Sequence, residues 1–162
     1  MNHLEQCIHE LGGVARASEL HARGHPAWEL RMLSEYGRIV RVRKGWYAAP
    51  ATSPQLLRAW RVGGRLACIS ALIHHGLVDA DETALHVGIT TGTSRLRHPD
   101  DKRERLTPGH DDSIVLHWAP RETTARHDET SRLVVPLEIA LEQAEHCRPR
   151  TTPAWTLRRD TL

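Results

Sequence analysis

Hydrophobic residues at the start of the chain recur at the spacing of a helix. Four of them fall at i, i+3, i+4 and i+7, namely Leu4, Cys7, Ile8 and Leu11. Asn2 and Glu5 resemble a capping box ahead of this run, and Gly12 and Gly13 follow it as a stop signal. The pattern predicts a first helix that supplies core contacts and carries no chemistry.

Two shorter helical segments follow. The first is predicted around residues 16–22 and ends at Gly24, the residue type best suited to a left-handed C-terminal cap. The second is predicted over residues 26–36, with Pro26 at the first helical position and Gly37 after the end. One side of this helix groups Ala27, Leu30, Leu33 and Ser34, and the other presents Trp28, Arg31, Met32 and Glu35.

A basic β-hairpin is predicted over residues 38–48. β-branched residues alternate with arginines from Arg38 to Arg43, Lys44 and Gly45 form the turn, and residues 46–48 return as the second strand. Helix, tight turn, helix and basic hairpin is the order of a winged helix-turn-helix, which we assign to residues 1–50. An edge strand protected from aggregation by its cations is the alternative explanation of the arginines.

Residues 51–147 predict a small α+β domain. Ser53 and Pro54 begin a helix that ends at Gly63 and Gly64, and a longer helix is expected to follow. Its apolar positions are Leu66, Ile69, Ile73 and Leu77. Alternating patterns predict strands near residues 85–90 and 114–118, and residues 133–135 predict a short strand before a helix that starts at Pro136. The predicted fold class is therefore α+β.

Two further segments carry no clear periodicity. Residues 91–112 contain five basic and five acidic residues, and we expect a solvated loop, with extra phosphate contacts as the alternative. Residues 148–162 contain two prolines and four arginines without an apolar face, so we expect a poorly ordered tail.

The run from Gly37 to Tyr47, GRIVRVRKGWY, resembles a motif in the N-terminal winged-helix domain of the AbiEi-type antitoxins and transcriptional regulators. The segment CISALIHHGL, residues 68–77, is similar to the region that follows this domain in longer relatives. The resemblance implies a DNA-binding regulator of the antitoxin type, often repressing its own promoter. Longer relatives continue into a restriction-endonuclease-like domain, whose Asp…Glu-x-Lys signature we do not find, so we expect no nuclease domain here.

The predicted DNA contacts divide between the second helix and the hairpin. If helix 26–36 enters the major groove, the candidate base readers are His25, Trp28, Arg31 and Met32. The candidate phosphate contacts are Arg38, Arg41, Arg43 and Lys44. Two alternatives stay open: Trp28 and Met32 pack against the second domain, or the module binds a protein such as a cognate toxin instead of double-stranded DNA. Glu29 and Glu35 would oppose phosphates, which favours the latter.

The charge distribution agrees with a polyanion contact at one end of the chain. Residues 1–65 carry ten Lys/Arg against five Asp/Glu, whereas the remainder carries twelve against fifteen, which together give the net charge of +2. A basic N-terminal module on a mildly acidic remainder suits a nucleic acid partner. An uneven solvated surface is the alternative.

Other function classes lack their signatures. No run of about eighteen apolar residues or basic leader predicts a membrane span or secretion. The three cysteines are widely spaced, which favours reduced thiols and a cytoplasmic protein. The twelve histidines include no HExxH motif and no Cys/His set at zinc spacing. His9, His21, His86 and His117 are scattered through different elements, and no glycine-rich phosphate loop, nucleophile elbow or recognisable Cys/His pair is present. We therefore expect no metal, no cofactor and no enzyme activity.

Overall fold

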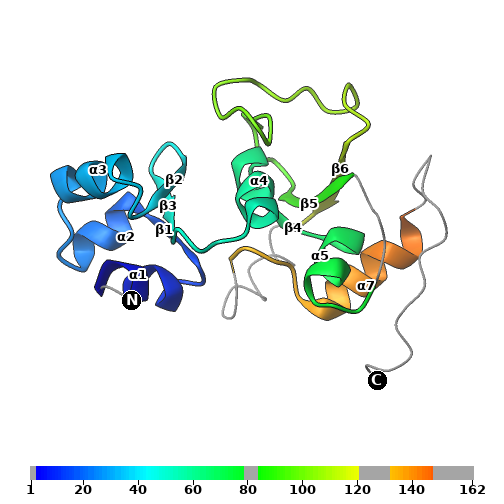
Figure 1. The fold of residues 1–162 in the computed structure, drawn as a ribbon. Coiled ribbons are helices and arrows are strands. Elements are labelled where there is room, and N and C mark those ends of the chain that lie inside the picture. Colours follow the sequence, from blue (N-terminus) through cyan, green and yellow to red (C-terminus); the bar gives the residue numbers. More distant parts are fainter. Residues whose placement is uncertain (1–2, 79–83, 121–131, 148–162) are drawn as a thin grey trace.

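The computed structural model describes residues 3–78, 84–120 and 132–147, and within them the protein is α+β. These residues form six helices and two three-stranded sheets (Figure 1). The elements of the N-terminal half, in chain order, are α1 (His3–Glu10), β1 (Val14–Arg16), α2 (Ala17–Ala22), α3 (Ala27–Glu35), β2 (Val40–Arg43) and β3 (Trp46–Ala48). The predicted helices and hairpin are present there, and the predicted tail and Asn2 lie outside the described residues.

Glycines fix where α2 and α3 end. Gly24 and Gly37 adopt positive φ angles of 90° and 67°, a conformation that glycine reaches without a steric penalty. The next N–H then turns back: His25 donates to the Leu20 carbonyl at 3.0 Å and Arg38 to the Leu33 carbonyl at 2.8 Å. These are the hydrogen bonds of a Schellman cap. One detail of the prediction is wrong, because Pro26 is the N-cap of α3 and not its first helical residue.

The first sheet has the order β1-β3-β2, and both pairings are antiparallel. The predicted hairpin supplies β2 and β3, with Lys44 and Gly45 at its turn. Strand β1 was not predicted: the three residues from Val14 to Arg16 pair with β3, although their sequence indicated a loop and a helix start. Such a short strand depends on its distant partner and leaves no periodic pattern of its own.

The second half contains α4 (Pro54–Val62), β4 (Arg65–Leu66), α5 (Cys68–His74), β5 (Leu85–Thr90), β6 (Ile114–Ala119) and α7 (Leu137–His146). Ser53 caps α4 as predicted, since its hydroxyl accepts a hydrogen bond from the Leu56 N–H. The predicted longer helix is wrong. Leu66 belongs to β4, and α5 has only seven residues. Of the predicted strand at residues 133–135, a single bridge between Val134 and Leu66 is present.

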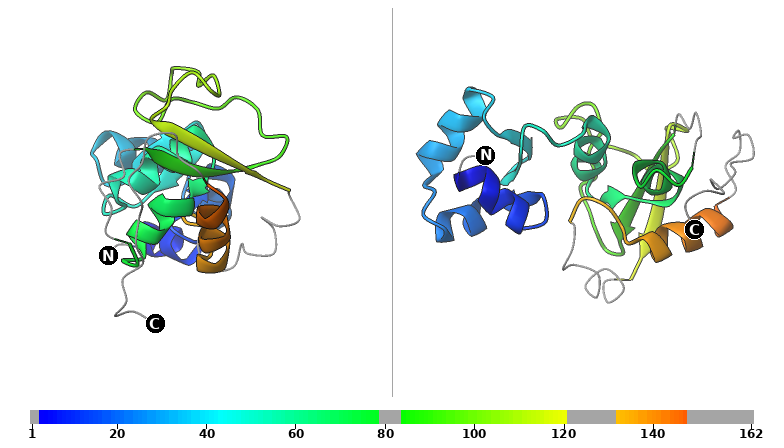
Figure 2. Two further views of the ribbon diagram at one scale, coloured as in Figure 1. Left: turned by 90° about the vertical axis from the view of Figure 1, so that its right-hand side faces the viewer. Right: turned by 60° about the horizontal axis from the view of Figure 1, so that its bottom comes forward.

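The second sheet has the order β4-β5-β6 and combines two strand directions. β4 runs antiparallel to β5, whereas β5 and β6 are parallel over their whole length, from Leu85 opposite Ile114 to Thr90 opposite Ala119. A parallel pair needs a long connection that returns the chain to the same end of the sheet. Residues 91–113 make that return, and α5 packs against both β5 and α7 (Figures 1 and 2).

The described residues form two hydrophobic cores. The smaller lies among the N-terminal helices and hairpin and includes Ile8, Leu20, Leu30, Ile39 and Tyr47. The larger lies around the second sheet and includes Leu66, Ile69, Leu72, Val87 and Ile89. Val14 of β1 belongs to the larger core although its neighbour Ala15 belongs to the smaller one. Because neighbouring side chains of a strand point to opposite faces, β1 contributes one residue to each core and so connects the two halves.

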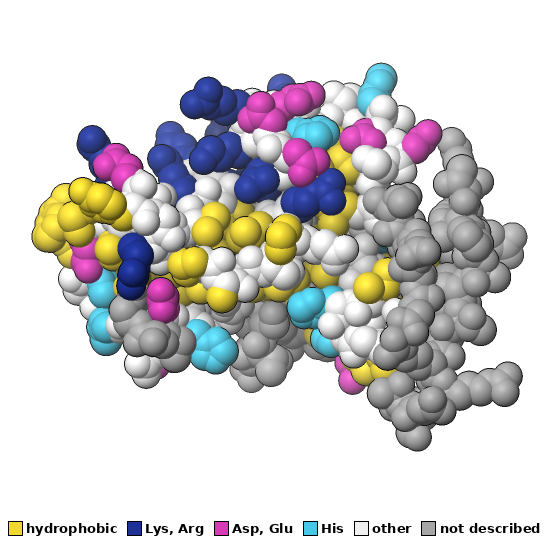
Figure 3. Space-filling view, in the orientation of Figure 1, with side chains coloured by type: hydrophobic (Ala, Val, Ile, Leu, Met, Phe, Trp, Pro, Cys, Tyr) yellow, Lys and Arg dark blue, Asp and Glu magenta, His cyan; other side chains and the backbone are white. Residues whose placement is uncertain are grey.

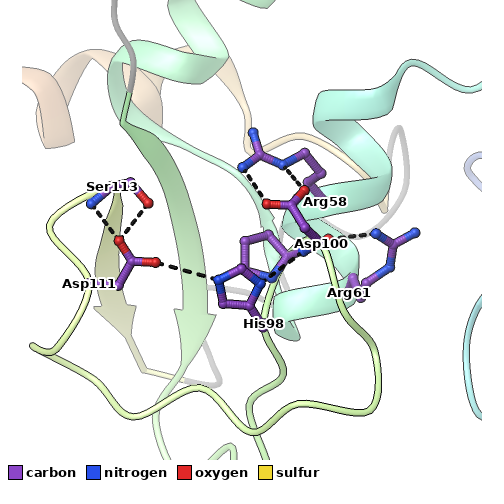
Figure 4. Close-up of polar contacts among 7 residues, drawn as sticks. Arg58, Arg61, His98, Asp100, Asp111 and Ser113 are labelled. Atoms are coloured by element: carbon purple, nitrogen blue, oxygen red, sulfur yellow. Dashed lines mark hydrogen bonds and ion pairs between the residues drawn. The ribbon is translucent and has the colours of Figure 1, made fainter.

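Segment 91–112 is attached to the domain and is not simply a solvated loop. Leu96 and Leu106 are buried in the larger core. Above α4, Arg58 forms a bidentate ion pair with Asp100 at 2.8 and 3.1 Å, and Arg61 donates to the Pro99 carbonyl (Figure 4). The expectation of a solvated loop missed these anchors because two isolated leucines in a charged segment give no periodic signal.

A second attachment joins the segment before α7 to the N-terminal half. The Arg132 N–H donates to the Gly12 carbonyl at 3.0 Å, and its guanidinium donates to both Glu19 carboxylate oxygens at 2.8 Å. Leu133 also lies close to Gly13: a Cβ added at Gly13 would come within 2.6 Å of the Leu133 side chain.

Among the described residues, no helix is long and apolar enough to cross a membrane.

Candidate nucleic-acid interface

The outer face of α3 carries an apolar stripe. Trp28, Met32 and Tyr36 follow one another at four-residue spacing and are 67 %, 39 % and 77 % exposed. Trp28 and Met32 thus have large exposed surfaces, which argues against the alternative that they pack against the second half. Tyr36 was missed in the sequence, although its spacing from Met32 places it on the same face.

Polar residues of α3 pair with each other beside this stripe. The Arg31 guanidinium donates to the Glu35 carboxylate at 3.1 Å, and 81 % of the Arg31 side chain is exposed. Glu29 faces His25 instead, at 3.1 Å from its Nδ1 atom. Glu35 is therefore the exposed acid on the outer face, next to the residue proposed to read bases.

His25 needs a correction, because it does not share this exposed face. Its side chain is buried between α1 and α3, where its Nε2 lies 3.1 Å from His3 Nδ1. The Schellman cap after α2 turns the chain at His25 so that its ring points inward. Of the four predicted base readers, Trp28, Arg31 and Met32 are accessible.

The hairpin cations divide into two kinds. Arg38, Arg41 and Lys44 are exposed, as phosphate contacts require. Arg43 is half-buried and reaches across the junction, so that a Cβ on Gly63 would lie 3.0 Å from its guanidinium. Burial, and secondarily repulsion by Arg97, lowers the pKa of Arg43. Its side chain therefore belongs partly to the junction between the halves.

Trp46 of the hairpin contacts Trp60 of α4 on one side and Arg16 of β1 on another. Trp46 packs edge-on against Trp60 of α4, with ring centroids 5.1 Å apart. The Arg16 guanidinium covers the same Trp46 ring at 4.8 Å from its centroid. A cation held over an aromatic face adds a positive charge next to the hairpin. Arg16 was not among the predicted cations of this surface, because β1 and its pairing with β3 were not predicted.

The surface view places these groups on one face. Lys and Arg side chains gather over the hairpin and continue over α4 and the loop above it, and the apolar patch lies at the α3 end (Figure 3). Acidic and histidine side chains interrupt the basic region near the loop. The arrangement can meet a polyanion through several separate cations.

Among the residues that the structure describes, two groups of side chains lie close enough together to hold a metal ion. One comprises His3, Cys7 and His25, and the other comprises Cys68, His86, His117 and Cys147. His86 and His117 belong to different elements, as the sequence predicts, but the pairing of β5 with β6 brings their rings together. Burial lowers the pKa of each of these two rings to about 4, with the neighbouring His86 ring adding to the effect on His117, so both are neutral at pH 7.

Comparison with known proteins adds no family assignment. No protein-family model matches the chain, and no curated protein matches it.

Proposed function

We propose that the protein is a DNA-binding transcriptional regulator of the antitoxin type, with residues 1–50 acting as a winged helix-turn-helix. The observation that supports this most directly is the element order α1-β1-α2-α3-β2-β3 with the outer face of α3 and three hairpin cations exposed. In a winged helix-turn-helix the second helix of the pair enters the major groove and the hairpin contacts the flanking backbone.

Each exposed group has a chemical role in this proposal. The Arg31 guanidinium can donate to a guanine edge, while Trp28 or Met32 contacts a thymine methyl group. Arg38, Arg41 and Lys44 contact phosphates, which requires no sequence information. Because Glu35 holds Arg31 in the free protein, DNA has to compete with this ion pair.

The hairpin is tested through the salt dependence of binding. A duplex first selected from random sequences is titrated with the wild-type chain and with Arg38→Gln, Arg41→Gln and Lys44→Gln. Each variant is expected to lower the slope of log affinity against log salt by roughly 0.9, because one phosphate is no longer neutralised. Arg23→Gln is the matched control, because Arg23 already pairs with Glu10 at 3.1 Å on another part of the same half. Three unchanged slopes would contradict the hairpin assignment.

A second candidate function rests on the apolar stripe of α3. Trp28, Met32 and Tyr36 together form the kind of exposed aromatic surface that is common at protein interfaces. In this version α3 binds a protein such as a cognate toxin.

Glu35→Gln separates the two candidates. Removing this carboxylate releases Arg31 and takes a negative charge away from the groove-facing side. If α3 enters DNA, affinity for all duplexes increases. If α3 binds only protein, the variant leaves duplex binding at the wild-type level, and Trp28→Ala leaves it unchanged too.

A further inference from the structure

Four side chains from four separate elements converge beneath the second sheet. Cys68 is the first residue of α5, His86 lies in β5, His117 lies in β6, and Cys147 follows the last residue of α7. One nitrogen or sulfur atom from each lies within 4.8 Å of all the others. The four residues span 80 positions of the chain, so only the fold brings them together.

Pairing between β5 and β6 places the two histidines on one face. His117 lies opposite Gly88, and His86 lies opposite Val115. Residues 86 and 88 share a face, as do 115 and 117, because side chains alternate along a strand. His86 and His117 are therefore diagonal neighbours on one face of the sheet.

The helices are held in place around this pair. The Cys68 N–H donates to the Gln143 side-chain oxygen at 3.0 Å, which fixes the start of α5 to α7. The His86 N–H donates to the Ser70 hydroxyl at 3.0 Å, which fixes α5 to β5. Cys68 also has a positive φ of 49°, unusual for a residue with a side chain. The surrounding structure thus holds the backbone at Cys68 in a conformation that a flexible chain would rarely adopt.

Two of the distances within this group are close to the edges of a tetrahedron around a zinc ion, and the remaining ones lie within 4.8 Å. His86 Nδ1 lies 3.1 Å from His117 Nε2 and 3.8 Å from Cys147 Sγ. With Zn–N bonds of about 2.0–2.1 Å and Zn–S bonds of about 2.3 Å, a tetrahedral centre has N–N edges of about 3.3 Å and N–S edges of about 3.6 Å. Both contacts converge on the same nitrogen of His86, as they do when one ion lies among the three atoms.

The burial of His86 also favours a metal ion at this site. His86 is fully buried, and its Nδ1 faces a ring nitrogen of His117 at 3.1 Å. An imidazole so placed satisfies one nitrogen with a metal ion more completely than with a second imidazole. Two thiolates balance the charge of a divalent ion, so the loaded site is neutral and can remain buried.

We propose that Cys68, His86, His117 and Cys147 bind one Zn²⁺ in a closed tetrahedral site that stabilises the second half. Two cysteines and two histidines form one of the common ligand sets of structural zinc, and with all four positions filled by protein the ion has no open position for catalysis. Binding releases the two thiol protons to solvent. The ion connects α5 and the end of α7 to strands β5 and β6. This structural role is independent of DNA binding.

The second group, His3, Cys7 and His25, differs from the proposed site in its number of ligands, its exposure and the direction of its contacts. It offers three ligands, and His3 is exposed. His3 uses different ring nitrogens for its two neighbours, with Nδ1 3.1 Å from His25 and Nε2 4.0 Å from Cys7. These contacts do not converge on one point, and His25 also contacts Glu29. It therefore serves as the matched comparison for the proposed site.

Metal content of the purified full chain tests the proposal. Protein made in zinc-supplemented medium and kept reduced without chelator is expected to contain one zinc per chain by mass spectrometry. Cys147→Ala and His117→Ala each lose this zinc, whereas Cys7→Ala, the matched removal of a thiol, retains it. Zinc that persists in Cys147→Ala but disappears from Cys7→Ala would overturn the assignment.

Cobalt reconstitution keeps the test valid if a variant fails to fold. Wild-type protein stripped of metal and titrated with Co²⁺ is expected to develop the visible bands of tetrahedral cobalt together with thiolate-to-metal charge transfer, saturating at one equivalent and abolished by Zn²⁺. Added chelator should lower the thermal midpoint of the zinc-loaded chain, since an ion that binds only the folded state stabilises it. Wild-type protein without stoichiometric zinc and without these cobalt bands would refute the site.

Discussion

The two halves of the molecule are organised differently. In the N-terminal half, the helices and hairpin follow one another closely in sequence and enclose a core of their own. In the second half, the core depends on contacts between distant segments, such as β5 with β6 and α5 with α7. The N-terminal half therefore gains its order mainly from neighbouring segments, whereas the second half gains its order from long-range contacts.

Truncating one buried leucine in each core tests this separation most strongly. Leu30 is 1 % exposed in the smaller core and Leu72 is fully buried in the larger one. Each change to Ala is expected to lower the free energy of unfolding by about 2–5 kcal/mol. Hydrogen exchange measured by mass spectrometry should show reduced protection mainly in the half that carries the substitution. Equal reduction across both halves in both variants would mean that the cores unfold as one unit.

The next largest loss of stability is expected from adding a side chain at Gly64, where the backbone of the neighbouring strand lies close. A Cβ at this position would lie 2.0 Å from the Gly88 carbonyl oxygen, so β4 and β5 would have to separate. Gly64→Ala is expected to destabilise the second half by at least about 1–3 kcal/mol, because a rigid backbone atom cannot move aside easily.

Gly37→Ala is the matched control for Gly64→Ala. Gly37 has a positive φ but open space around it, so its substitution should cost about 1 kcal/mol. Urea denaturation gives the free energy of unfolding of both variants and so compares the cost of steric crowding at Gly64 with the cost of backbone strain at Gly37. A smaller loss of stability at Gly64 than at Gly37 would show that the strands adjust more readily than this contact implies.

The ion pair between Glu19 and Arg132 should make the connection between the halves sensitive to acid. Hydrogen bonds from Arg132 lower the pKa of Glu19 in the folded protein, with a smaller contribution from the Arg16 N–H. The stabilisation is therefore present above the pKa that Glu19 has in the unfolded chain, and it is lost as the pH falls through the lowered folded value.

The expected contribution of this ion pair near neutral pH is about 1 kcal/mol, and Glu19→Gln should remove that part of the acid dependence. Denaturant titrations from pH 7 to pH 3 measure it. An identical pH profile in wild type and variant would show that the pair does not couple the halves.

Sequence reasoning succeeded where structure is local. The spacing of Leu4, Cys7 and Ile8 predicted α1, the alternation around Val42 predicted the hairpin, and Ser53 marked the start of α4. It failed where a partner lies far away in the chain, as for β1, for β4 and for the anchors of segment 91–112.

The candidate sites follow the same rule. Exposure of Arg38, Arg41 and Lys44 followed from the hairpin pattern, whereas the burial of His25 depends on its packing against α1. The group of Cys68, His86, His117 and Cys147 follows no spacing rule, because the register of two parallel strands and the placement of two helices create it. Cysteines and histidines that are scattered in a sequence can therefore lie side by side in the folded chain.

The contact of Arg132 and Leu133 with Gly12 and Gly13 limits how the chain can be divided for engineering. A fragment ending at Pro50 would retain its own small core but lack the guanidinium that neutralises Glu19. It would also expose Val14, which belongs to the larger core around the second sheet. Grafting the N-terminal half onto another protein therefore requires a substitute for this returning segment, or redesign of the surface that it covers.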